Sequence, residues 1–208
     1  MTAEQFQAQH ITDRNELRNL VKVRDPKDED WILDMLVSSG ALLKEGHFLL
    51  ESNQHSTGLL RFDYVSGSRK NLELIADRLI NELKRDRVYF DAVLTQEHAG
   101  RALGETIADK LGKRILVMET DEHNQPVNKI INENALYPND RVLTVVDMTT
   151  TGTGLRRMIA HVRQKKAIPV AIALFATRSK QEISKLENDE SLKVYSVADI
   201  AFEWETVA

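Results

Sequence analysis

The sequence predicts an α/β protein in which a parallel sheet is flanked by helices. Two observations carry this prediction: short apolar runs alternate with amphipathic segments, and polar, glycine-containing turns follow two of the runs. The runs that we expect to be buried strands are residues 88–94, 114–118, 142–146, 168–175 and 193–197. Strands that alternate with helices are typical of parallel sheets with helices on both faces.

The expected helices have apolar residues at helical spacing. The clearest are residues 72–83, 107–111 and 155–162. An earlier helix is expected to begin at Asp25-Pro26, where an N-cap residue precedes proline, and to end at Gly40. We assign residues 1–30 to a polar N-terminal arm, helical or loose, and residues 31–208 to a single domain.

Composition narrows the class of protein. An apolar fraction of 42% over 208 residues suffices for one domain with a sizeable core. No apolar run is long enough for a membrane span, and the N-terminus lacks the apolar core of a signal peptide. The absence of cysteine excludes disulfides and thiolate metal sites, and it fits a cytoplasmic protein. With a net charge of −4 and no long basic cluster, nucleic-acid binding is not expected.

Residues 141–154 form the most informative stretch. An apolar run ends at Asp147, a turn rich in threonine and glycine follows, and an amphipathic helix begins after it. Glycines let a backbone approach a phosphate, and the amides of a helix N-terminus favour an anion. Asp147, at the carboxyl end of a strand, could bind sugar hydroxyls or hydrated magnesium. The alternative is an ordinary strand–loop–helix connection capped by threonines.

This stretch resembles the 5-phosphoribosyl 1-diphosphate (PRPP) loop of type I phosphoribosyltransferases. The family pattern is an apolar run, two acids and a Thr/Ser/Gly-rich turn; here the first acid is replaced by Val146. The resemblance implies a type I phosphoribosyltransferase fold and Mg²⁺. It makes Asp147 the ribose-binding, metal-binding and catalytic acid. The residues expected to hold PRPP are Asp147, Thr149, Thr150, Thr151, Gly152, Thr153 and Gly154.

A second anion-binding loop is expected at residues 95–104, between a strand and a helix. It resembles the pyrophosphate loop of the family, because Glu97 and Gly100 match adenine and xanthine phosphoribosyltransferases. The residues implied to bind pyrophosphate are Thr95, Gln96, Glu97, His98, Ala99 and Gly100. Arg101 either adds positive charge to this loop or is a solvated arginine on the helix.

Residues 40–65 are expected to form a strand pair with a polar turn around Asn53. They resemble the N-terminal hood of orotate phosphoribosyltransferases, and the matching residues are Gly46, Phe48, Leu50, Ser52 and Ser56. The resemblance implies that Phe48, Glu51 and Arg178 face the base. Because Glu51 replaces a lysine that binds the orotate carboxylate, we do not expect orotate to be the preferred base. Surface roles for Glu51 and Arg178 remain the alternatives.

The segment after residue 118 resembles the mobile loop of the orotate family. Glu119 and His123 match the pattern, and the resemblance makes His123 a candidate catalytic residue. The cationic positions of the pattern hold Val117, Met118 and Asp121 instead. A leaving pyrophosphate needs positive charge nearby, so we expect slow turnover or none, with ligand binding retained. The alternative for His123 is a solvated loop histidine.

Taken together, the resemblance covers about residues 30–200 and lies closest to the orotate branch. It implies a hood from about residues 40–65 plus the C-terminal segment, and a core from about 66–198. It also implies a homodimer that transfers phosphoribosyl from PRPP to a nitrogen base and releases pyrophosphate. The competing hypothesis is a non-catalytic PRPP or nucleotide sensor, or a regulatory protein, on the same fold.

Overall fold

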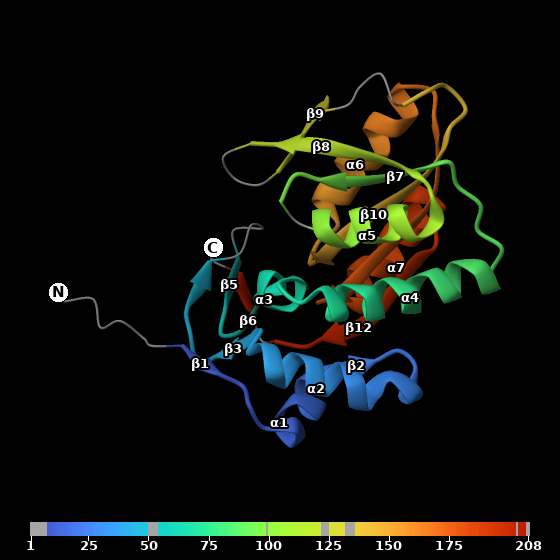
Figure 1. Cartoon of the computed structure of the whole chain (residues 1–208). Coiled ribbons are helices and arrows are strands. Elements are labelled where there is room, and N and C mark those ends of the chain that lie inside the picture. The colour runs from blue at the N-terminus through green and yellow to red at the C-terminus, as the bar shows by residue number, and fades with distance from the viewer. Residues whose placement is uncertain are drawn as a thin grey trace.

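The computed structural model describes residues 8–49, 54–98, 100–121, 125–131, 136–202 and 204–206. Its centre is a seven-stranded sheet in the order β2-β12-β11-β10-β7-β8-β9 (Figure 1). The five inner strands are parallel and the two edge strands are antiparallel to their neighbours, which confirms the predicted parallel sheet. The strands are β2 Val21–Val23, β7 Ala92–Gln96, β8 Arg114–Thr120, β9 Pro126–Ile130, β10 Arg141–Thr149, β11 Ile168–Thr177 and β12 Val194–Ile200.

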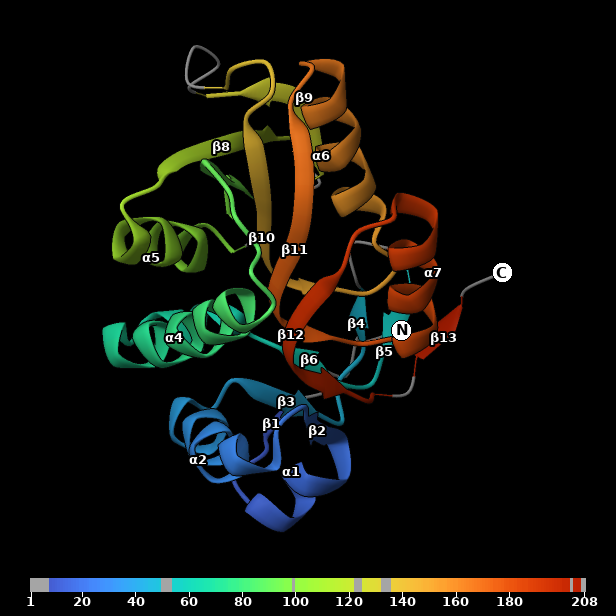
Figure 2. The ribbon, with the colours of Figure 1, turned by 90° about the vertical axis from the view of Figure 1, so that its right-hand side faces the viewer.

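Helices cover both faces of the sheet (Figure 2). One face carries α4 (Arg69–Arg85) and α5 (Arg101–Leu111), and the other carries α6 (Thr153–Gln164) and α7 (Lys180–Glu190). The central strand β10 contributes side chains to the apolar clusters on both faces of the sheet, because successive residues of a strand point to opposite faces. Leu143 and Val145 join the apolar cluster under α4 and α5, whereas Val142 and Val146 join the cluster under α6 and α7.

The N-terminal segment is more integrated than a loose arm. It forms α1 (Arg14–Leu20), then β2 on the edge of the main sheet, then α2 (Glu29–Ser39). A 3-10 turn, Pro26–Asp28, precedes α2 and is capped by the Asp25 side chain, which accepts from the amide of Lys27 at 3.1 Å. Gly40, with φ of 62°, ends α2 as expected.

The hood consists of two small sheets beside the main one. The first joins β1 (Gln9–His10), β3 (Leu42–Lys44) and β6 (Leu59–Leu60); the second joins β4 (Phe48–Leu49), β5 (Gln54–Ser56) and β13 (Trp204–Thr206). The predicted strand pair is therefore β4 with β5. The C-terminal segment returns to the hood as expected, because β13 pairs with β5.

Three local features differ from the expectations. Residues 62–65 are helical in α3 (Phe62–Ser66) rather than extended. The strand expected at 88–94 begins only at Ala92, after Val88 closes the end of α4 by donating to the carbonyl of Leu83. Helix α7 was not predicted, since only Ile183 and Leu186 of its residues are buried and the apolar pattern is correspondingly weak.

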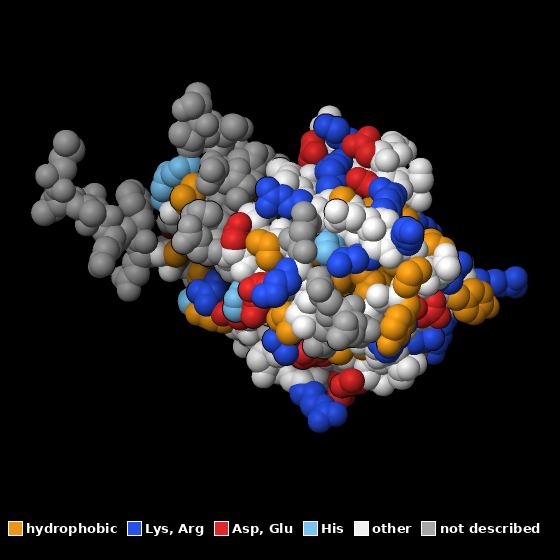
Figure 3. All heavy atoms as spheres, turned by 90° about the horizontal axis from the view of Figure 1, so that it is seen from above, with side chains coloured by type: hydrophobic (Ala, Val, Ile, Leu, Met, Phe, Trp, Pro, Cys, Tyr) orange, Lys and Arg blue, Asp and Glu red, His pale blue; other side chains and the backbone are white. Residues whose placement is uncertain are grey.

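The surface fits the mixed composition of the chain. On the face shown in Figure 3, Lys and Arg side chains are scattered among acidic, apolar and polar ones rather than gathered in one continuous patch. None of the helices within the described ranges combines the length and the apolarity needed to cross a bilayer.

Candidate functional site

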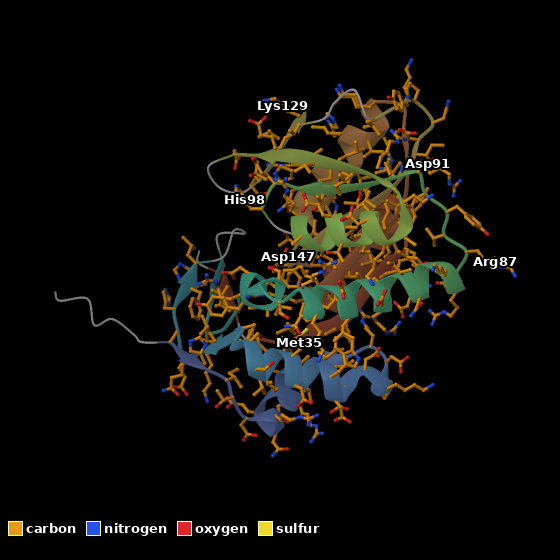
Figure 4. The ribbon with its side chains drawn as sticks, in the orientation of Figure 1. Met35, Arg87, Asp91, His98, Lys129 and Asp147 are labelled. Atoms are coloured by element: carbon orange, nitrogen blue, oxygen red, sulfur yellow. The ribbon has the colours of Figure 1, made fainter. Side chains whose placement is uncertain are left out.

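The two predicted loops meet at one end of the sheet. Strands β7 and β10 are parallel neighbours, so the loops that follow them lie side by side at their carboxyl ends. Figure 4 shows His98 of the first loop and Asp147 of the second at this end, and Arg87 and Asp91 at the opposite end. A Cβ atom at Gly100 would lie 2.5 Å from the Asp147 amide nitrogen and from the Val146 carbonyl carbon. The first loop therefore rests directly on the backbone of the second.

The turn between β10 and α6 has the geometry of an anion site. Gly152 has φ of 73° and is the N-cap residue of α6, and it makes no side-chain cap hydrogen bond to the first helical amides. The Gly152 amide donates to the Thr149 hydroxyl at 3.1 Å, and the hydroxyls of Thr151 and Thr153 are 3.0 Å apart. The side chains of Thr150, Thr151 and Asp147 are half-buried, whereas Thr153 is exposed.

The loop predicted to bind pyrophosphate begins inside the sheet. Thr95 and Gln96 are buried residues of β7 and pair with Val117 and Met118 of β8. Beyond them, the Glu97 amide donates to the Met118 carbonyl at 2.9 Å, and His98 is exposed. Ala99 lies outside the described residues.

Gly154 of the predicted PRPP turn brings a third segment into the site. A Cβ atom at Gly154 would lie 3.5 Å from Pro126 of β9 and 3.8 Å from Oε1 of Gln96. The start of α6, the end of β7 and the turn end of the β8–β9 hairpin therefore converge at one place.

Arg101 points along its helix rather than across the loop. Its Nε atom donates to Oε1 of Glu105, one turn further on, at 2.7 Å. This hydrogen bond raises the pKa of Arg101. The arrangement favours a surface ion pair between Arg101 and Glu105 within the helix over a contact of Arg101 with pyrophosphate.

The segment that resembles a mobile loop is the hairpin of β8 and β9. The ammonium of Lys129 lies 2.6 Å from the carboxylate of Glu119, so the lysine of this hairpin is paired with an acid. Val117 and Met118 are inside the sheet, with exposed fractions of 5% and 0%. Reading these two positions as sites for loop cations is therefore wrong, because a charge there would be buried. His123 lies outside the described residues.

Arg178 is buried, so its interpretation as a surface-turn arginine is wrong. It is 5% exposed, and its amide donates to the Thr149 carbonyl at 3.2 Å, which ties it to the PRPP turn. Its Nη1 atom lies 3.5 Å from the Ser56 hydroxyl, while Nε and Nη2 have no hydrogen-bond partner within the described part of the chain. Loss of hydration lowers the pKa of Arg178 to about 10.

The surroundings of Arg178 come from the hood. Phe48 is the register partner of Ser56, so these two side chains share one face of the β4–β5 hairpin. The Phe202 ring lies 5.6 Å from the Arg178 guanidinium, a contact that sequence reasoning missed. A Cβ atom at Gly58 would lie 2.1 Å from that ring, so Gly58 makes room for it. Glu51 lies outside the described residues, and its predicted role is not tested by these contacts.

Comparison with known proteins identifies the family. The chain matches no family model. It is 30% identical to an orotate phosphoribosyltransferase of a Nitratiruptor species over 175 residues, which cover 79% of this chain and 83% of the relative. It is 26% identical to the orotate phosphoribosyltransferase of Pyrococcus abyssi over 167 residues, 80% and 90% of the two chains.

Solved structures show the same fold. The orotate phosphoribosyltransferase of Aeropyrum pernix superposes with a TM-score of 0.67 at 20% identity, covering 80% of this chain and 92% of its own. The adenine phosphoribosyltransferase of Thermoanaerobacter pseudethanolicus gives 0.57 at 16% identity, with coverage of 69% and 88%. On the sequence relationship and the shared fold, the chain belongs to the type I phosphoribosyltransferase family, close to the orotate phosphoribosyltransferases.

Proposed function

We propose that the protein transfers the phosphoribosyl group of PRPP to a nitrogen base and releases pyrophosphate. The bond between ribose C1 and the pyrophosphate oxygen breaks, and a bond from C1 to the base nitrogen forms. Such a step proceeds through a cation-like sugar, so catalysis is largely positioning and charge stabilisation. The observation that carries the proposal is the contact of Gly100 with the Asp147 backbone, which places a second loop beside the phosphate turn.

The residues divide into three proposed subsites. Residues 150–154 hold the 5-phosphate, and Asp147 binds the ribose hydroxyls. Residues 95–100 hold the pyrophosphate, with Glu97 half-buried beside β8. Arg178 and Phe48, which both neighbour Ser56, face the base. His123 stays a predicted catalytic residue from the hairpin.

Magnesium is proposed as the metal, with most of its ligands supplied by the substrate phosphates and by water. The described residues contain no group of three or more potential ligands that could form a closed cage. Mg²⁺ instead keeps several waters and binds one or two carboxylates plus substrate phosphates. Asp147, half-buried at the carboxyl end of β10, suits that role. The ion would neutralise part of the negative charge on the leaving pyrophosphate.

A homodimer is also proposed, on the resemblance of the β8–β9 hairpin to a loop that serves a partner subunit. Sedimentation equilibrium of the purified protein measures it directly. If the hairpin completes the neighbouring site, activity per chain falls when dilution dissociates the dimer.

The direct test of function is pyrophosphate release from PRPP and Mg²⁺ with a panel of bases that includes orotate, uracil, adenine and xanthine. Base-dependent release supports the proposal. PRPP binding without release for any base would favour the sensor. The sensor hypothesis is supported by Val146, a buried apolar residue at the position where the family pattern has its first acid.

Substituting Gly152 with valine is expected to abolish PRPP binding. A β-branched residue is strained at φ of 73°, and a Cβ atom would lie 3.1 Å from Nη1 of Arg156. Calorimetry with PRPP measures the loss, and circular dichroism shows that the variant is folded. Unchanged PRPP affinity in a folded variant would contradict a phosphate site at this turn.

Changing Glu51 to lysine is expected to improve orotate binding by about tenfold, the factor for one added charge contact of about 1.4 kcal/mol. The reason is electrostatic, since the family's lysine is replaced here by an acid that repels a carboxylate. The Michaelis constant for orotate measures the change, and Glu51→Gln separates loss of repulsion from gain of attraction. Wild-type protein that uses orotate better than every other base would refute the hypothesis.

Changing Asp121 to lysine is expected to raise slow wild-type turnover by about tenfold or more, since a well-placed donor to developing charge is worth about 100-fold or more. Asp121 is exposed at the hairpin tip, where it accepts from the Gln125 amide at 2.9 Å. A lysine there can act on developing charge with little change in PRPP affinity. The matched control is Asp121→Asn, which removes the negative charge only. Equal rates for the two variants would show that the added cation has no role.

A further inference from the structure

Arg156 occupies a position that helix electrostatics disfavours. It lies in the first turn of α6, and its amide donates to the Gly152 carbonyl at 2.9 Å. The N-terminus of a helix carries partial positive charge, so a cation is expected in the last turn rather than the first. Arg163, in the last turn of the same helix, follows that rule. Contacts other than the helix dipole must therefore hold Arg156 in place.

Those contacts join the phosphate turn to the next helix. Nη1 of Arg156 donates to the Thr151 carbonyl at 3.1 Å, and Nη2 donates to Oδ2 of Asp189 in α7 at 2.9 Å. The planar guanidinium can make both bonds at once, whereas an ammonium is a single point charge. Leu186 of α7, which is fully buried, packs under the same turn near Gly152.

The bond to Thr151 sets the direction of a backbone amide. In a trans peptide the carbonyl and the following N–H point in opposite directions. With the Thr151 carbonyl turned toward Arg156, the Gly152 N–H points into the turn, where it meets the Thr149 hydroxyl at 3.1 Å. Glycine places little restriction on its own backbone, so this peptide could otherwise rotate and present its carbonyl to the phosphate.

We propose that Arg156, anchored by Asp189, is a positioning residue that fixes the Thr151–Gly152 peptide so that its amide faces the 5-phosphate. This inference rests on the proposed function, because it concerns the same phosphate turn. Arg156 acts through the backbone and through α7, and it need not touch the substrate. The consequence is selective: the 5-phosphate subsite depends on Arg156, and the pyrophosphate loop does not.

The chain supplies a matched control. The guanidinium of Arg163 pairs with the carboxylate of Glu190 in α7 and donates to the Glu190 carbonyl at 2.9 Å. Arg163 therefore also links α6 to α7. It lies at the far end of the helix from the phosphate turn. Arg156→Gln and Arg163→Gln therefore each remove one α6–α7 link, but only the first frees the Thr151 carbonyl.

The experiment measures calorimetric affinities of the full chain for ribose 5-phosphate and for pyrophosphate with Mg²⁺, together with melting temperatures. Arg156→Gln is expected to weaken ribose 5-phosphate binding about tenfold, the usual effect of losing a hydrogen bond from a charged group. Pyrophosphate affinity stays unchanged. Asp189→Asn weakens ribose 5-phosphate binding to a smaller degree, and Arg163→Gln leaves both affinities at the wild-type values.

Three results would overturn the inference. The first is equal ribose 5-phosphate affinity in Arg156→Gln and Arg163→Gln, even if both lower the melting temperature, because the role would then be structural. The second is full recovery by Arg156→Lys, which would show that charge alone is needed. The third is a wild-type protein that binds neither PRPP nor ribose 5-phosphate; that result alone would also refute the proposed function.

Discussion

Gly100→Ala is expected to abolish activity and to lower PRPP affinity by at least about 100-fold, since displacements of about 1 Å at a reacting site can have that effect. A Cβ atom at this position would lie 2.5 Å from three backbone atoms of Val146 and Asp147. Strand β10, which contains Val146 and Asp147, cannot move away easily, because it is the central strand and is paired on both sides. The clash would therefore separate the two loops that the proposed reaction needs together. Steady-state kinetics and calorimetry with PRPP measure the loss.

Gly112→Ala is the control for backbone strain. Gly112 ends α5, the helix that Gly100 begins, and its φ of 60° is close to the 75° of Gly100. A Cβ atom at Gly112 would meet nothing within 4 Å. Both substitutions carry a left-handed strain of about 1 kcal/mol, but only Gly100→Ala adds the clash. If the two variants lost activity equally, contact between the loops would not be the cause.

Much of the fold follows from patterns that the sequence displays openly. The central strand is predicted correctly at 142–146 because apolar residues lie on both of its faces, as a buried parallel strand requires. The helix at 72–83 reads correctly because its buried positions recur at helical spacing. Strands and helices at the edge of the fold are harder to predict from the sequence, since they bury fewer apolar side chains. Strand β2 has only Val21 fully buried, so nothing in residues 21–23 distinguishes a strand that pairs with β12 from a polar arm.

In the candidate site, features that depend on neighbouring residues can be predicted from the sequence, whereas features that depend on distant residues cannot. The turn at 149–154 is local, so its glycines and hydroxyls predict a turn between strand and helix, but not that Gly152 rather than a threonine is the N-cap of α6. The burial of Arg178 is not local. It results from Ser56 and Phe202, which lie far away in sequence and reach Arg178 only after the C-terminal segment packs on the hood. Alignment to a loop pattern was misleading at Met118 because that pattern carries no information about burial inside β8.

Arg178→Met is expected to stabilise the protein while removing base binding. Burial lowers the pKa of Arg178 to about 10, so folding disfavours its charged form. That penalty is fully present at pH 7 and decreases only as the pH rises through about 10. Methionine fills the space beside Phe202 without a charge, so we expect about 1 to 3 kcal/mol of added stability. Chemical denaturation at pH 7 measures this gain.

Arg178→Met is also expected to lose base binding, because the variant lacks the buried guanidinium group. Nε and Nη2 of Arg178 have no hydrogen-bond partner within the described residues, and the proposed base would supply oxygen atoms that accept from them. Removing one side of a buried charged contact raises the Michaelis constant of the base by about 100-fold or more. PRPP affinity should stay within about threefold, because the bond to Thr149 comes from the backbone amide, which methionine retains.

Arg24→Met distinguishes this behaviour from a general effect of losing an arginine. Arg24 is 40% exposed and pairs with Asp199 at 2.8 Å, so its charge has a partner and its removal should slightly lower stability. Base binding should not change in Arg24→Met. A stabilised Arg178→Met that still binds the base normally would assign the guanidinium no role in recognition. A destabilised one would mean that Ser56 and Phe202 satisfy the buried charge better than its lowered pKa indicates.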